Sequence, residues 1–185
     1  MRTLGVFSCL VAVFVSTAGI AFGQTVAAPP AKAVEPKAAD VASMDSIIKA
    51  VYDVISGPAG QKRDWDRMRS LFTAKATLSA AVRTQKGDIR YIPMDVDGYI
   101  SRSGPYLEQR GFFEREISRH ADTFASISQV FSTYESRNKV DDKKPFERGI
   151  NSFQLLNDGK RWWIVSIYWE GEDPTTTIPR KWLRG

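Results

Sequence analysis

The side chains best suited to acid–base chemistry lie in the segment Ser118–Asp122, which reads SRHAD. His120 is the only histidine of the chain, and Asp122 follows two residues later. Residues two apart share a face of a β-strand, so the carboxylate can orient the imidazole as a general base. His120 and Asp122 are therefore candidate catalytic residues. The alternative is a surface histidine near a charge, because the sequence shows no nucleophile or metal partner for it.

Two carboxylates precede this histidine in the same predicted strand. Regular alternation puts Glu114 and Glu116 on the face of His120, where they could share a proton or hold a cation. A solvated outer face explains the same pattern more simply. The opposite face of this strand also combines apolar side chains with arginines. The sequence therefore leaves open which face points toward the interior of the fold.

Aromatic residues are concentrated in the last predicted hairpin, NSFQLLNDGKRWWIVSIYW, whose turn is formed by residues 157–160. Apolar walls with a few polar groups are typical of sites for small molecules. The candidate ligand-binding residues are Tyr134, Gln154 and Ser166 for hydrogen bonds, with Trp163 and Trp169 as ring walls. Strand propensity and cross-strand packing are the alternative explanation for these residue types.

Helices are expected early in the chain and strands late. Apolar spacing predicts helices over residues 43–56 and 64–72, and a helix from residue 95 that breaks at Gly104-Pro105. Alternation predicts strands over 76–83 and 89–94, then two long strands over 112–137 and the final hairpin. This order indicates an α+β fold, with a curved antiparallel sheet packed on the N-terminal helices.

Two stretches, IIKAVYDVIS…DWDRMRSLFTAKATL and GINSFQLLNDGKRWWIVSIYW, resemble the opening and closing of the nuclear transport factor 2-like superfamily. The resemblance covers about residues 44–169 and is nearest to small exported SnoaL-like or DUF4440-like members. It implies a cone-shaped α+β fold with a deep pocket. Members include ketosteroid isomerases, polyketide cyclases, dehydratases and proteins that only bind or dimerise, so the resemblance implies no particular reaction. No catalytic residue of these enzymes can be matched here.

The N-terminal residues are expected to be a leader rather than part of the domain. Residues 1–23 have a basic start, an apolar stretch and a small-x-small cleavage site, which is typical of a secretory signal peptide. Residues 24–42 are rich in Ala, Pro and Lys and predict a disordered linker, which leaves residues 43–185 as one domain. We expect a periplasmic or secreted protein with no stable membrane insertion after cleavage.

Composition argues against several function classes. The net charge is +5, and basic residues are interleaved with acidic ones instead of forming the stripe of a nucleic-acid binder. The single cysteine, Cys9, lies in the predicted signal peptide, so we expect neither a disulfide nor a zinc site in the exported chain. No dinucleotide, phosphate-loop or nucleophile-elbow motif is present, and no cofactor is expected.

Regular alternation predicts that Trp162 lies on one face of the last strand, and Trp163 and Trp169 on the other. One face then closes a core or pocket, and the other is expected to meet a second subunit in a homodimer. The leading hypothesis is an exported domain that binds a small apolar molecule without catalysis. The alternatives are an isomerase, cyclase or dehydratase that uses His120 and Asp122, and a protein-interaction module.

Overall fold

The computed structural model of the protein describes residues 34–84 and 86–184. The predicted signal peptide lies outside these residues, as does the predicted linker up to residue 33. The rest of that linker is structured, because residues Ala38–Val41 form helix α1 and the Val41 side chain is buried. The prediction that the domain starts at residue 43 was therefore wrong by several residues.

Three longer helices follow α1. They are α2 (Met44–Ile55), α3 (Trp65–Leu71) and α4 (Val96–Arg110). Each begins at a predicted cap, where the side chain of Ser43, Asp64 or Asp95 accepts a hydrogen bond from a backbone N–H of the first turn. None of the helices in the described ranges is long and apolar enough to cross a membrane.

Helix α4 differs from the prediction, because it runs through Gly104 and Pro105 without a break. A proline inside a helix removes one backbone hydrogen bond. Here the adjoining Gly104 lets the helix approach the Trp65 ring closely, since a Cβ at this position would lie 3.1 Å from that ring. The packing of α4 on α3 therefore favours continuation of the helix, and α4 ends only at Gly111, which has a φ of 77°.

Six strands form one sheet in the order β2-β1-β6-β5-β4-β3. They are β1 (Phe72–Arg83), β2 (Ile89–Met94), β3 (Phe113–Phe124), β4 (Ile127–Arg137), β5 (Glu147–Asn157) and β6 (Trp162–Gly171). All neighbours are antiparallel except β1 and β6, which are parallel. The predicted α+β class is confirmed, as are the four long antiparallel strands at its end.

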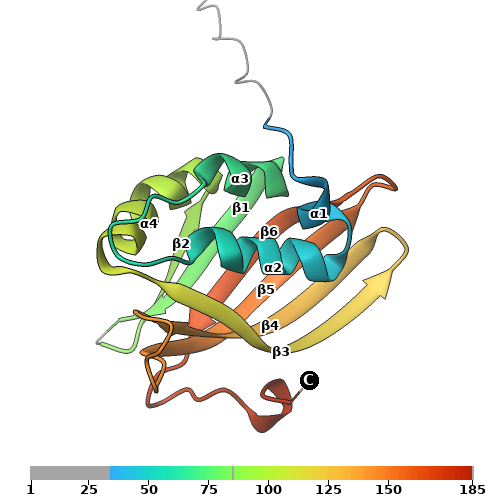
Figure 1. The fold of residues 1–185 in the computed structure, drawn as a ribbon. Helices are drawn as coiled ribbons and strands as arrows, with labels where there is room; N and C mark the ends of the chain where they lie inside the picture. The colour runs from blue at the N-terminus through green and yellow to red at the C-terminus, as the bar shows by residue number, and fades with distance from the viewer. Residues whose placement is uncertain (1–33, 85, 185) are drawn as a thin grey trace, which may run out of the picture. The chain divides into compact units, whose positions relative to one another are not determined.

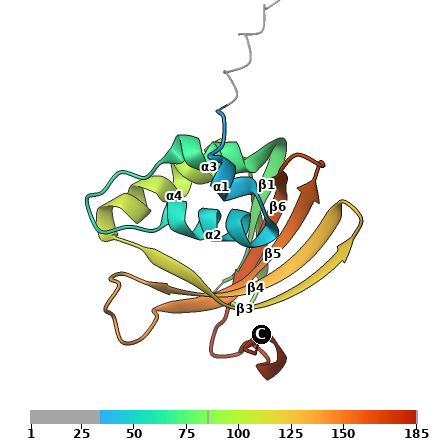
Figure 2. The same ribbon diagram turned by 45° about the vertical axis from the view of Figure 1, so that its right-hand side comes forward.

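The sheet curves around the helices and has two different faces (Figure 1). Helices α2, α3 and α4 lie on the inner face, and the C-terminal segment with the short 3₁₀ helix η1 (Arg180–Trp182) crosses the outer face (Figure 2). The core lies between α2 and the sheet, where Ile47 and Ile48 of α2 and Phe153 and Ile164 of the sheet are fully buried.

Irregularities in two strands change which side chains face the core. In β3, Ile117 is an extra residue between Glu116 and Ser118, which pair with consecutive residues of β4. In β6, Val165 is an extra residue between Ile164 and Ser166. Each bulge reverses the alternation along its strand.

The bulge in β6 corrects the prediction about the tryptophans. Trp162 and Trp169 both pack against the core, although they are seven residues apart, because Val165 shifts the alternation between them. Trp163 lies at the other side, where its ring stacks on the Arg161 guanidinium and its indole N–H donates to Asp158 at 2.8 Å. Trp163 and Trp169 therefore do not share a face.

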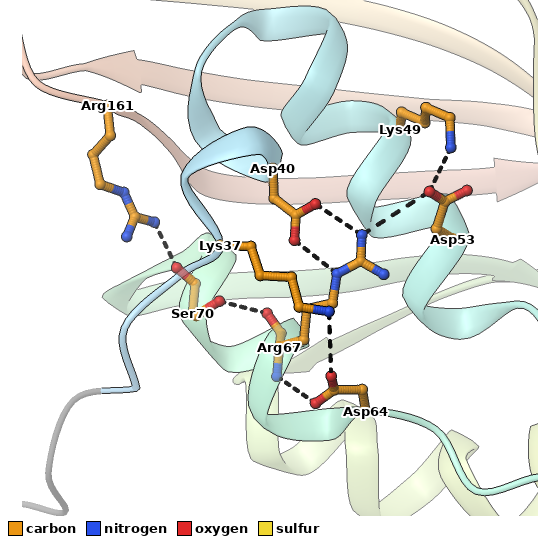
Figure 3. A network of polar contacts seen from close by, with 8 residues as sticks. All are labelled: Lys37, Asp40, Lys49, Asp53, Asp64, Arg67, Ser70 and Arg161. Carbon is orange, nitrogen blue, oxygen red and sulfur yellow. Dashed lines mark hydrogen bonds and ion pairs between the residues drawn. The ribbon is translucent and has the colours of Figure 1, made fainter.

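Hydrogen bonds from two arginines, Arg63 and Arg67, connect the helices of this layer. The guanidinium of Arg63 donates to the carbonyl oxygens of Ile55, Gly57 and Leu107 at 2.6–3.1 Å, which joins the end of α2 to α4. Arg67 of α3 donates two hydrogen bonds to Asp40 of α1, at 2.7 and 2.9 Å (Figure 3). These contacts fix the helices that form one wall of the site described next.

Candidate functional site

A cavity of about 320 Å³ lies between helices α2 and α4 and the inner face of the sheet. Its walls are mainly apolar and include Val51 of α2, Leu78 of β1 and Phe153 of β5. Besides Phe153, five aromatic residues line it: Tyr99, Tyr106, Phe112, Tyr134 and Trp169. This volume lies at the lower end of the range for sites that enclose small molecules, about 300–1,000 Å³.

A polar cluster stands on the sheet side of this cavity. Glu114 of β3 accepts hydrogen bonds from the Ser136 hydroxyl at 2.8 Å and from the Asn151 amide at 3.4 Å. The Tyr134 hydroxyl donates to Oε1 of Glu147 at 3.0 Å. Three neighbouring strands thus direct two carboxyl groups, a phenol and an amide toward one otherwise apolar space.

The carboxyl group of Glu114 is unusual in its proton affinity. Its pKa is raised to about 7, chiefly by burial and also by the nearby charge of Glu147, while the hydrogen bonds from Ser136 and Asn151 oppose the shift. Desolvation has this effect because it disfavours the charged form of an acid. Glu114 therefore exchanges its proton near neutral pH, which is the property expected of a group that handles protons or charge in a ligand site.

The Tyr134 side chain occupies space that a glycine on the neighbouring strand leaves free. It pairs with Gly149 of β5, and a Cβ at Gly149 would clash with the Tyr134 hydroxyl and the Glu170 carbonyl. The phenol therefore crosses above Gly149 to reach Glu147. Burial, followed by the charge of Glu147, raises the pKa of Tyr134, so this hydroxyl stays protonated and donates.

A chain of hydrogen bonds leads from the cavity into the space between α2 and the sheet. The Asn151 amide donates to the Tyr52 hydroxyl at 3.1 Å, and Tyr52 lies 2.6 Å from the Ser132 hydroxyl. Ser132 donates to Glu116 at 2.6 Å, and Glu116 in turn accepts from Arg119. Because every member has a partner, the network fixes the orientation of the Asn151 amide beside Glu114.

Only two of the predicted ligand-binding residues line the cavity. Tyr134 supplies its hydroxyl, and Trp169 supplies a ring that packs edge-on against Tyr99 at a centroid distance of 6.1 Å. Gln154 and Ser166 pair with each other on the outer face of the sheet. Trp163 packs on Arg161 near the β5–β6 turn. The geometry thus leaves Gln154, Ser166 and Trp163 away from this site.

The predicted catalytic pair also lies away from the cavity. His120 and Asp122 are exposed on β3, beyond the bulge at Ile117. The imidazole of His120 packs against Trp182 at a centroid distance of 4.8 Å, and its Nε2 lies 2.8 Å from the Lys181 carbonyl, to which it must donate. His120 therefore holds the C-terminal segment on the outer face, and the acid–base candidate in the cavity is Glu114.

Sequence reasoning did not single out Glu147, Asn151 or the special role of Glu114. The available signal was in β4, where Ser132, Tyr134 and Ser136 alternate on a face that also carries Val130. All four are buried on the inner side. Polar residues repeated at inward positions indicate a buried polar network. Among the residues that the structure describes, no three potential ligands come together in a way that could hold a metal ion.

Comparisons with known proteins support the fold. No family model matches the chain, and no curated protein matches it by sequence. Solved structures do match. An NTF2-like protein of unknown function from Pseudomonas putida KT2440 is 8% identical with a TM-score of 0.53, over 77% of this chain and 95% of that one.

Two further solved structures match similar fractions of this chain. A protein of unknown function with a cystatin-like fold from Nostoc punctiforme PCC 73102 is 11% identical with a TM-score of 0.54, over 76% of this chain and 96% of that one. An NTF-2 like protein of unknown function from Silicibacter pomeroyi DSS-3 is 14% identical with a TM-score of 0.48, over 71% and 94%. The two structures with TM-scores above 0.5 confirm the expected fold: the chain has the nuclear transport factor 2-like fold.

Proposed function

We propose that this nuclear transport factor 2-like domain binds a small, largely apolar molecule in the cavity between α2, α4 and the sheet. The observation that carries the proposal is the combination of an apolar cavity of about 320 Å³ with converging polar groups from β3, β4 and β5. Apolar walls provide most of the binding free energy, and a few fixed polar groups orient the ligand. In this proposal Trp169 is a wall and the Tyr134–Glu147 pair is the polar end.

We propose further that the protein acts outside the cytoplasm, because residues 1–23 have the pattern of a secretory signal peptide. The bound molecule would then be met in the periplasm or the medium. Binding alone, without reaction, accounts for the site as described.

An uncharged apolar dye, N-phenyl-1-naphthylamine, tests whether the cavity is accessible. We expect saturable one-to-one binding with an increase in dye fluorescence. Val51→Phe extends a ring into the cavity from α2 and should weaken binding at least tenfold. Val140→Phe adds the same ring at an exposed position in the loop between β4 and β5 and should leave binding unchanged. Equal binding by both variants would place the dye elsewhere and contradict the proposal.

The second candidate function is an enzyme with Glu114 as a general acid or base. The specific observation in its favour is the pKa of about 7 for a carboxyl group in an apolar cavity. Native mass spectrometry of the protein purified gently from cells separates the two functions. A retained molecule that is recovered unchanged after long incubation supports binding alone. Conversion of that molecule, lost in Glu114→Gln, supports catalysis.

A further inference from the structure

The two carboxyl groups of the cavity differ from the other glutamates of the same strands in lacking a cation. Glu116 of β3 is paired with Arg119, and Glu135 of β4 is paired with Arg115 and Arg137. Glu114 and Glu147 make no ion pair with any residue that the structure describes, although arginines are abundant nearby. Glu147 is an exposed residue, whereas Glu114 is desolvated by its surroundings. A negative charge on Glu114 is therefore unfavourable until a cation neutralises it.

Aromatic rings surround the same space. Tyr99 and Tyr106 come from α4, Phe112 precedes β3, and Trp169 comes from β6. The faces of such rings attract organic cations, most strongly when water is excluded, and aromatic cages are the usual protein sites for substituted ammonium groups. The Arg110 guanidinium already lies over the Tyr106 ring, 5.4 Å from its centroid, which leaves Tyr99, Phe112 and Trp169 as the rings for a ligand. A cavity lined by these rings and by unpaired carboxylates is therefore suited to a cation with an apolar body.

One basic residue, Arg102 of α4, also lines the cavity. Its side chain is exposed, and it makes no ion pair with Glu114 or Glu147 in the described part of the chain. Arg102 can attract an anion to the entrance, but it does not neutralise the carboxyl groups on the sheet side. The experiment below includes an anion for this reason.

We propose that the ligand of the cavity is an organic ammonium ion with a compact apolar or aromatic body, bound through its nitrogen by Glu114 and Glu147. The inference rests on the proposed binding function and names its ligand class. The ammonium N–H groups donate to the two carboxylates, while the Tyr134 hydroxyl holds Glu147 in place. The apolar body packs against Tyr99 and Trp169.

The binding step also moves a proton. Without ligand, Glu114 is largely protonated below its pKa of about 7. An ammonium ion favours the carboxylate form, so binding near pH 6 releases the Glu114 proton to solvent. The other titratable or charged groups around the site are Tyr52 of α2, Tyr99 and Arg102 of α4, Tyr134 of β4 and Glu147 of β5. Burial raises the pKa of each of Tyr52, Tyr99 and Tyr134, so these phenols stay protonated.

Three probes of nearly equal shape test the ligand class: benzylammonium, benzyl alcohol and benzoate. Isothermal titration calorimetry of the purified protein should show benzylammonium binding at least tenfold more tightly than benzyl alcohol at pH 7.5, and benzoate binding least. Repeating the titration at pH 6 in two buffers of different ionisation enthalpy should show proton release with benzylammonium alone.

Variants identify the groups responsible. Glu114→Gln should reduce the preference for benzylammonium over benzyl alcohol at least tenfold and abolish proton release. The circular dichroism spectrum and the urea denaturation curve show whether the variant is folded. Glu147→Gln should reduce the same preference independently. If both variants keep the full preference for benzylammonium, the assignment of these two carboxylates is wrong.

The remaining outcomes separate the two proposals. If benzyl alcohol binds as tightly as benzylammonium in the wild-type protein, the ammonium proposal is wrong and the binding function stands. If benzoate binds best, Arg102 selects the ligand and the ammonium proposal is wrong as well. If none of the probes binds at millimolar concentration and the apolar dye also fails, the binding function itself is wrong.

Discussion

Glu114 and Glu116 are two positions apart on β3 and have opposite electrostatic surroundings. Glu116 accepts two hydrogen bonds from the Arg119 guanidinium, at 2.6 and 2.8 Å. Glu114 has only the neutral donors Ser136 and Asn151. A neutral donor compensates a buried negative charge far less than a guanidinium does. Both residues are glutamates, so it is the lack of a guanidinium partner that makes Glu114 the proton-exchanging group.

The raised pKa of Glu114 predicts a dependence of stability on pH. Its folded pKa of about 7 exceeds the ordinary value of 4.5, so the folded protein binds this proton more tightly than the unfolded chain. The stabilising contribution is fully present below pH 4.5 and is lost as the pH rises through 7. Glu114→Gln removes this pH-dependent contribution. The unfolding free energy of the variant minus that of the wild type should therefore increase by about 2 kcal/mol between pH 5 and pH 8.

Urea denaturation at the two pH values measures this change. Glu35→Gln alters an exposed carboxylate and serves as the matched control, for which we expect no comparable pH dependence. A constant difference between Glu114→Gln and wild type from pH 5 to pH 8 would show that the Glu114 carboxyl is already ionised at pH 5.

Of the residues that line the cavity, the sequence singled out Tyr134 and Trp169 but neither Glu147 nor Asn151. It also did not reveal which side of the sheet each residue of β3 faces. His120 was the obvious candidate because histidine titrates near neutral pH. Its face depends on Ile117, the extra residue of β3, which reverses the alternation between Glu116 and Ser118. Bulges depend on pairing with the neighbouring strand, so the pattern along a single strand does not reveal them. Tyr134 lies on β4 between Ser132 and Ser136, which are also buried on the inner side, so no bulge changes its face.

At the scale of the elements, helix α1 is too short to be stable by itself and is held by side chains of its neighbours. Four residues make barely one helical turn, which is unstable in isolation. Asp40 contributes both carboxylate oxygens to Arg67 of α3 (Figure 3). The Val41 side chain is buried. The predicted linker had the composition of a disordered segment, and these distant partners explain why its last part is ordered.

Arg67→Met should therefore release α1. It leaves the partly buried Asp40 without its partner, so we expect a loss of about 1–3 kcal/mol of unfolding free energy and faster proteolysis before residue 43. The Arg67 guanidinium lowers the pKa of Asp40, so this contribution is present above the ordinary carboxyl pKa and is lost as the pH falls through the lowered value. Urea denaturation and limited proteolysis measure the two effects.

The pair Lys49–Asp53 on α2 offers the control, because both side chains are well exposed. Lys49→Met should change stability by less than about 0.5 kcal/mol. The double variant Arg67→Met with Asp40→Asn tests the coupling directly. If the two single effects simply add, the ion pair does not hold α1 and the burial of Val41 alone must do so.

The whole molecule has an outer sheet face that is only partly covered. The C-terminal segment crosses the part near β3 and β4 (Figure 2). Its Trp182 ring packs against Phe131 at a centroid distance of 5.1 Å. Near β1, β2 and β6 the face carries Tyr91, Tyr168 and Val165, which are 62%, 48% and 41% exposed. Clusters of exposed aromatic and aliphatic residues of this kind are typical of protein interfaces.

We predict that this uncovered part joins two copies of the chain in a homodimer. The reason differs from the sequence argument, because Trp163 and Trp169 do not share the outer face, and the two tyrosines form the patch instead. Tyr91 and Tyr168 pack edge-on at 6.0 Å and present one continuous aromatic surface. Sedimentation velocity at micromolar concentration should show a dimer for the wild-type protein. Tyr168→Lys should convert it to a monomer by placing a charge in the apolar contact.

Two comparisons decide whether the interface is this patch. Val140→Lys changes a residue that is 74% exposed in the loop between β4 and β5, away from the sheet, and should leave the dimer intact. Dye binding should persist in the Tyr168→Lys monomer, because the cavity lies on the opposite face of the sheet from Tyr168. A wild-type monomer would show that the tyrosine patch is left open to solvent. A dimer that survives Tyr168→Lys would place the interface on another surface.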